Sequence, residues 1–216
     1  MRESVPILTV PEIRDYQRIN AQLVALLEAG HRHIRLVGVE GQRLLVFGLK
    51  GSWSATIEVE GRAGPELAAE LEAPSLVVVA RGPAADGAGR HLRAGTLLIL
   101  GDADAAVAYG QAGGLVVVIG SAGPRAGLEL AGGTLVLAGA VGRLAGERQS
   151  GGQIFAFADR LGPHAGHGRR GGRLILLPPG QVGSRGITPE EAATLRSALA
   201  AVAPWLPPGA ARTLVS

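Results

Sequence analysis

The chain contains no cysteine among its 216 residues. That absence excludes disulfides, thiolate zinc sites, iron–sulfur clusters and any cysteine nucleophile. Aromatic residues are also scarce, because three Phe, two Trp and two Tyr are the whole supply, so a core must be built from aliphatic side chains. No apolar run is long enough to cross a membrane, and no secretory signal is recognisable at the start of the sequence. We therefore expect a cytoplasmic protein with no membrane partner and no bound cofactor.

Lysine is nearly absent too, since a single Lys stands beside twenty Arg. The isoelectric point is about 10.1, yet the formal net charge is only +3. The surplus lies in residues 101–186, where eight Arg face five acidic residues, and its densest part is Arg169, Arg170 and Arg173. Aromatic side chains are not interleaved with these basic ones, so stacking platforms for bases are lacking and no nucleic-acid partner is expected.

Glycine, in contrast, is abundant, with 34 residues, and much of it follows a repeat. Pairs of small residues recur every 19 or 20 positions, and each pair is followed by five mainly apolar residues. The segments between the apolar stretches are too short and too interrupted by glycine to form helices, which favours an all-β solenoid. The pairs are Pro74-Ser75, Ala94-Gly95, Gly113-Gly114, Gly132-Gly133, Gly151-Gly152 and Gly171-Gly172.

This repeat predicts a mainly β protein, a right-handed parallel β-helix of about seven coils with short N- and C-terminal helices. Successive coils of such a fold stack about 4.8 Å apart, so a side chain at a sharp corner meets its own copy above and below. A corner that also requires a positive φ favours glycine further. The predicted coil corners are Gly95, Gly113, Gly114, Gly132, Gly133, Gly151, Gly152, Gly171 and Gly172.

The two ends of the chain contain helix signals. Thr9 to Glu12 resembles a capping box that would open a helix ending at Gly30, and Thr188 to Glu191 repeats the device before a second amphipathic helix. Two strands, residues 34–39 and 43–47, are expected between the first helix and the coils. The resulting division is an N-terminal cap over residues 1–50, the solenoid over 51–180, and a C-terminal helix and tail over 181–216.

The parity of each predicted strand separates an inner from an outer face. The second and fourth positions are apolar in every coil, beginning with Val77 and Val79, and are expected inside. The third position, beginning with Val78, is apolar as well and is expected outside. An outer apolar stripe must be covered by the chain's own helices or by a partner. The candidate interface residues are Val117, Val136, Phe155, Phe157 and Ile175.

The order and spacing of several glycine motifs resemble a known superfamily. The motifs are Gly101-Asp102-Ala103-Asp104, Gly110-Gln111-Ala112-Gly113-Gly114, Gly146 to Gly151, the stretch from Asn20 onward, Gly41-Gln42 and Gly48-Leu49-Lys50-Gly51. Together they resemble the Gly-x-Gly-x-Gly β-helix domain at the C-terminus of the glutamate synthase large subunit, over residues 13–180. The scaffolding subunit of formylmethanofuran dehydrogenase is a more distant likeness.

The resemblance implies a β-helix without catalytic residues of its own, which holds other domains or subunits in a fixed relation. The chain lacks the amidotransferase, the flavin barrel and the cluster-binding cysteines of the full synthase, so it supplies at most one component. The resemblance therefore implies a scaffold or coupling subunit that assembles with itself or with an enzyme of amino-nitrogen or one-carbon metabolism.

Several residues of chemically reactive types have competing structural roles. His164 and His167 are weak candidates for metal ligands, because no third ligand stands at a defined spacing. Ser150 is the best candidate nucleophile of an alternative, esterase-like hydrolase, but it lies where the repeat demands a small residue. Asp102 and Asp104 follow a strand, where Asp side chains commonly bond the backbone. We therefore expect no catalytic, cofactor or metal site.

Overall fold

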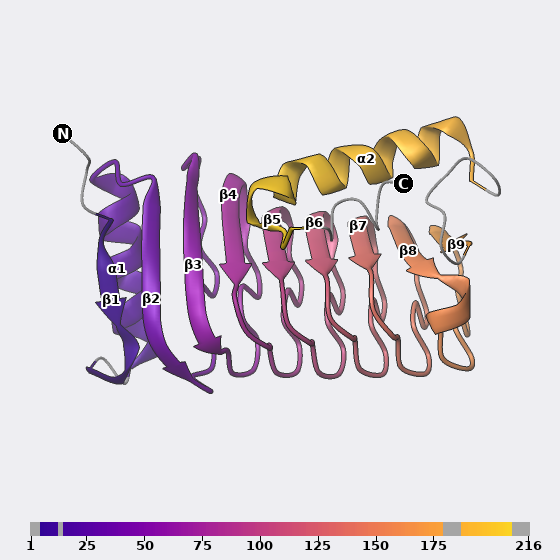
Figure 1. The fold of residues 1–216 in the computed structure, drawn as a ribbon, viewed down its shortest axis with the longest axis horizontal. Helices are drawn as coiled ribbons and strands as arrows, with labels where there is room; N and C mark the ends of the chain where they lie inside the picture. The colour runs from indigo at the N-terminus through magenta and orange to yellow at the C-terminus, as the bar shows by residue number, and fades with distance from the viewer. Residues whose placement is uncertain (1–4, 13–14, 179–186, 209–216) are drawn as a thin grey trace.

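The computed structural model describes residues 5–12, 15–178 and 187–208 and shows a β-solenoid of about seven turns (Figure 1). Nine parallel strands form one sheet in chain order, so each strand pairs with the one before it and the one after it. This confirms the predicted fold class. The strands are β1 (Ile7–Thr9), β2 (His33–Glu40), β3 (Ala55–Arg62), β4 (Glu72–Ala80), β5 (Ala94–Ile99), β6 (Ala112–Val118), β7 (Gly132–Leu137), β8 (Gln153–Phe157) and β9 (Arg173–Leu177).

Two α-helices and three short 3₁₀ turns complete the described elements. They are α1 (Tyr16–Glu28), α2 (Pro189–Val202), η1 (Val10–Glu12), η2 (Ala158–Arg160) and η3 (Ala203–Trp205). The capping box predicted at Thr188 is present, since its side chain accepts from the Glu191 N–H and Glu191 accepts from the Thr188 N–H. In the described residues, neither helix is both long and apolar enough to cross a bilayer.

The N-terminal segment differs from its prediction in two places. Thr9 ends strand β1, and the helix begins seven residues later with Asp15 as its N-cap, so the capping box predicted at Thr9 is wrong. The strand predicted over residues 43–47 is also wrong. Leu44 and Val46 have φ values of 59°, which no β-strand contains, and they form the first of the turns described below.

The interior of the solenoid is a column of stacked aliphatic side chains. One inner row is paired strand by strand through the whole sheet, and its members from β2 to β8 are at most 1% exposed. This row is Leu8, Leu36, Val59, Ala80, Ile99, Val118, Leu137, Ala156 and Leu176.

The predicted parity holds from β5 onward but is shifted by one residue in β4. Val78 aligns with Leu97 and lies in the core, whereas Val79 aligns with Leu98 on the outer face. The cause is an irregularity in the β4–β5 pairing between Glu72 and Val77. A one-residue slip moves every following side chain to the opposite face.

Each glycine pair lies where a coil enters its strand, and its two members meet different constraints. Gly114 has φ +63°, a conformation that L side chains rarely adopt. Gly113 does not, but a Cβ there would overlap the carbonyl oxygen of Arg93 in the coil below. The second residue thus needs freedom in φ, and the first needs the absence of a side chain.

A turn before each glycine pair has an unusual alternating backbone, and we call it the arc. In the arc between β5 and β6, Ala106, Ala108 and Gly110 all have positive φ. The Ala106 and Gly110 N–H groups donate to the next coil, and the Ala108 N–H donates to the preceding one. Thirteen described residues other than glycine have positive φ. Hydrogen bonds to both neighbouring coils offset the strain of this conformation.

Two buried glutamines tie the arcs to the glycine pairs. Gln111 is fully buried, and its Nε2 donates to the carbonyls of Gly113, Gly114 and Thr134. Gln149 repeats the same set of bonds two coils later. The glutamine side-chain amide therefore provides hydrogen bonds for the carbonyl groups that the glycine turn directs toward the core.

The first arc is closed by a side chain of α1 in place of a preceding coil. The Asn20 side chain donates to the Leu44 carbonyl over 2.9 Å and accepts from the Val46 N–H over 2.8 Å. Ile19, Leu23 and Leu27 of the same helix join the interior core. Helix α1 thus closes the N-terminal end of the column rather than covering the outer stripe.

Candidate functional site

On the outer face of the sheet, both the type of side chain and its exposed fraction change along the solenoid. One row of this face is paired continuously from the first strand to the last, and we call it the central row. Its members are Ile7, Arg35, Glu58, Val79, Leu98, Val117, Val136, Phe155 and Ile175. The row therefore changes from charged on β2 and β3 to apolar from β4 onward.

The apolar part of this face is covered by the chain's own helix α2, as Figure 1 shows along the top of the solenoid. The candidate interface residues Val117, Val136, Phe155, Phe157 and Ile175 are 0–6% exposed and form one cluster with Leu195, Ala198, Leu199 and Val202 of α2. The stripe therefore presents no exposed surface to a partner in this conformation.

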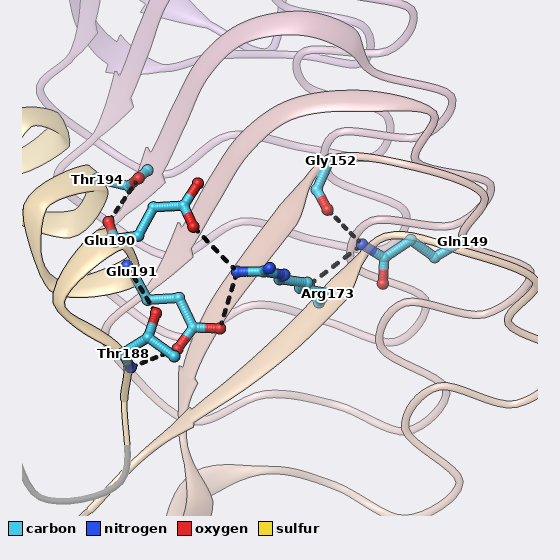
Figure 2. Close-up of polar contacts among 7 residues, drawn as sticks. All are labelled: Gln149, Gly152, Arg173, Thr188, Glu190, Glu191 and Thr194. Atoms are coloured by element: carbon cyan, nitrogen blue, oxygen red, sulfur yellow. Dashed lines mark hydrogen bonds and ion pairs between the residues drawn. The ribbon is translucent and has the colours of Figure 1, made fainter.

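Helix α2 is anchored at its N-terminus to the last strand. Figure 2 shows the Arg173 side chain of β9 reaching toward the two carboxylates of the first helical turn. The Arg173 Nη1 lies 3.4 Å from Glu191 Oε1 and 4.0 Å from Glu190 Oε2. Acidic groups at a helix N-terminus also interact favourably with the helix dipole. The Arg173 carbonyl accepts from Gln149, so the anchor is linked to the coil corner.

The charged part of the face is a network of ion pairs centred on Glu58. Glu58 is 7% exposed, its Oε1 lies 2.7 Å from His33 Nε2, and its Oε2 accepts from the Arg81 guanidinium over 2.7 Å. These partners come from β2 and from the residue that follows β4, so the carboxylate joins three successive coils. A buried carboxylate needs such partners, because desolvation without them is costly.

A second ion pair lies beside the first. Arg35 Nε donates to Glu60 Oε1 over 2.6 Å. This hydrogen bond lowers the pKa of the Glu60 carboxyl below its ordinary value and raises the pKa of Arg35. The network lines a hollow of about 680 Å³, formed by Val5, His33, Arg35, Glu58, Glu60 and Arg81. This hollow is the charged surface that the outer face leaves uncovered by α2.

A groove also runs beside α2, at the start of the middle strands. It has a volume of about 700 Å³ and is lined mainly by small residues and hydroxyls, among them Gly95, Thr96, Thr134, Thr194 and Ser197. Its lining residues contain no charged side chain.

The predicted chemical candidates lie away from this face, in the turns of the last coils. Ser150 is exposed, and its N–H donates to the Leu130 carbonyl of the preceding coil. His164 and His167 are exposed and belong to the last arc, where the His167 N–H donates to the His164 carbonyl. Within the described residues, no three His, Asp or Glu side chains are grouped to hold a metal ion.

The acidic pair Asp102 and Asp104 has a structural role. Asp102 Oδ1 accepts from the Ser121 N–H over 2.7 Å, which links two successive coils. Asp104 Oδ2 lies 3.5 Å from an Arg62 guanidinium nitrogen. The cluster around Glu58 was missed by sequence reasoning, although alternating charges in Thr56-Ile57-Glu58-Val59-Glu60 marked one polar strand face.

In comparisons with known proteins, no protein-family model, curated protein or solved structure matches this chain.

Proposed function

We propose that this chain is a non-catalytic scaffold or coupling subunit, of the type formed by the glutamate synthase β-helix domain that its glycine motifs resemble. In this role it holds an enzyme of amino-nitrogen or one-carbon metabolism in a fixed position. The proposal rests on the continuous stack of coils, in which the nine strands pair in sequence order without a break. Hydrogen bonds between successive coils also run through the turns, so the body resists bending.

The charged hollow around Glu58 supplies a docking surface that suits this role. Its charged side chains are already held in place on three successive coils of the sheet, so they lose little conformational entropy when a polar partner binds. Its carboxylates and guanidinium groups favour a partner with interspersed charges of both signs.

Affinity capture of the full chain from its native cell tests the scaffold role. The wild type is expected to retain an enzyme of amino-nitrogen or one-carbon metabolism, identified by mass spectrometry. Replacing the exposed control residue Ala140, as Ala140→Lys, is expected to leave capture unchanged, whereas removing a partly exposed charge from the hollow, with Arg35→Gln, is expected to weaken it.

Ester hydrolysis by the purified chain tests the competing hydrolase. The scaffold role predicts no turnover of p-nitrophenyl esters above the buffer rate. A chain that binds no enzyme and shows turnover abolished by Ser150→Ala would overturn the proposal.

A further inference from the structure

The two ends of the solenoid carry the unpaired edges of the sheet. Strands β1 and β9 stand at opposite ends of the strand order (Figure 1), so among the described residues each pairs on one side only. The exposed large apolar side chains of the described residues are confined to these ends. They are Val5 and Ile7 at the first strand, 37% and 53% exposed, and Leu176 in the last, 45% exposed. Exposed edges with apolar side chains are surfaces that readily pair with another strand.

The edges of β9 and β1 match in direction, and the rows of the sheet define the register in which they would join. All strands of the sheet are parallel, so the β1 edge of a second copy can join β9 in the same orientation that the sheet already uses eight times. Continuing the existing rows places Leu8 of the second copy over Leu176 and Ile7 over Ile175. The inner row then continues across the junction, and Leu176 and Leu8 each gain the second neighbour that the seven positions between them already have.

Positive charge is more concentrated at the C-terminal end of the solenoid than at the N-terminal end. Residues 141–177, the last two coils, contain six Arg against Glu147 and Asp159, a formal charge of +4. Residues 1–50, the N-terminal cap, contain five acidic and seven basic residues, a formal charge of +2. At the N-terminal end Asp15, Glu28 and Glu40 are exposed, with the basic Arg18 and Arg32 among them. Two C-terminal ends facing each other would repel, whereas the mixed exposed charges of the N-terminal end oppose the approach of a C-terminal end less.

The outer face of α1 permits close approach at the N-terminal end. Its core face holds Ile19, Leu23 and Leu27, while Ala21 and Ala25 are exposed on the opposite side. Because these side chains are small, the end layer formed by β1 and α1 can lie close against the last coil of a neighbouring copy.

We propose that this chain binds a second copy of itself head to tail, with the β1 edge of one copy added to the β9 edge of the next. This inference rests on the proposed scaffold role and names one partner of it. Because the two surfaces are different, the contact is heterologous and leaves one free end of each kind, so the assembly grows with concentration.

Sedimentation velocity of the purified full chain, over a concentration series, tests this contact. The wild type is expected to form a ladder of oligomers that lengthens as the concentration rises. Leu176→Lys and Ile7→Lys each place a charge in the contact and are expected to weaken association about tenfold or more. Both side chains are about half exposed, so the fold should survive, as circular dichroism would verify.

An equimolar mixture of the two variants distinguishes the head-to-tail arrangement from others. Each variant keeps one intact end, so the mixture is expected to form dimers and nothing larger. The exposed mid-solenoid variant Ala140→Lys should behave as the wild type. Dimers of Ile7→Lys alone would show pairing of C-terminal ends and overturn the proposal, as would a wild type that stays monomeric at all concentrations. A monomer would leave capture of an enzyme, and hence the scaffold role, to be decided by its own experiment.

Discussion

The outer face of the sheet contains two regions built on the same backbone but stabilised in different ways. Glu58 and Val79 are paired neighbours in the central row and are both buried, at 7% and 0% exposure. Val79 is covered by apolar contacts in the α2 cluster, whereas Glu58 is enclosed by its hydrogen-bond partner His33 and its ion-pair partner Arg81. Burial alone therefore does not decide which residue type occupies this row; the chemistry of the covering groups does.

The length of α2 explains where one region ends and the other begins. The helix has 14 residues and so extends about 21 Å, which corresponds to four or five strand spacings. Anchored by Arg173 on β9, it reaches β4 and leaves β2 and β3 uncovered. Strands β2 and β3, beyond its reach, carry the ion pairs, whereas Ile7 at the end strand β1 stays apolar and exposed.

The largest expected effect is in the covered region. Phe155→Ala removes a fully buried ring beneath α2 and is expected to lower the free energy of unfolding by about 3–5 kcal/mol. Urea denaturation followed by circular dichroism measures this loss. The matched truncation Val37→Ala, on the half-buried part of the outer face, is expected to cost about 1 kcal/mol or less. Equal losses at the two positions would contradict the difference between the regions.

The charged region is expected to respond to the loss of its central carboxylate. Glu58→Ala leaves His33 and Arg81 without their shared partner and is expected to cost about 1–2 kcal/mol in the free energy of unfolding, because Arg81 is partly exposed and screened. Glu58→Gln keeps the shape and one acceptor, so its loss in the same urea denaturation should be smaller. A Glu58→Val variant more stable than the wild type would show that apolar packing suffices here without α2.

The sequence predicted the solenoid and, from β5 onward, its inner rows because both follow from the repeat, and it predicted the C-terminal helix from signals of its own. Helix α2 has its capping box at Thr188 and its apolar stripe in the sequence itself, and both are present. The slip that moved Val78 into the core arises from an irregular pairing between two strands, which no single strand reveals. The arcs were missed because residues such as Leu44 adopt positive φ only when neighbouring coils accept and donate their hydrogen bonds.

The candidate site was predicted less well than the fold. Ser150, His164 and His167 were singled out by residue type, yet they lie on exposed turns. The network around Glu58 joins residues about 25 positions apart, and its diagonal contacts depend on strand register. The stripe was recognised correctly as apolar, but which element covers it depends on where the distant helix docks.

A moderate effect is expected from the cap of the covering helix. Thr188→Ala removes the hydrogen bond to the Glu191 N–H and is expected to cost about 1 kcal/mol. The loss should appear as faster amide hydrogen exchange in α2, with the charged region unchanged. Thr194→Ala, whose hydroxyl donates within the same helix to the Glu190 carbonyl, serves as the control and should change stability by less. Equal acceleration of exchange in β2 and β3 would show that the regions are not separable.

The smallest expected effect is a pH dependence in the charged region. The hydrogen bond from Arg35 lowers the pKa of Glu60, so the stability it contributes is present above the ordinary carboxyl value of about 4.3. That contribution is lost as the pH falls through the lowered value in the folded state. Both side chains are about one-third exposed, which keeps the contribution small. The stability difference between wild type and Glu60→Gln should therefore disappear in acid and shrink in 1 M salt. Glu40→Gln, at an exposed position at the end of β2, is the matched control. A difference at Glu60 that persists in acid would mean that Glu60 acts by packing, and the charged region would then resemble the covered one.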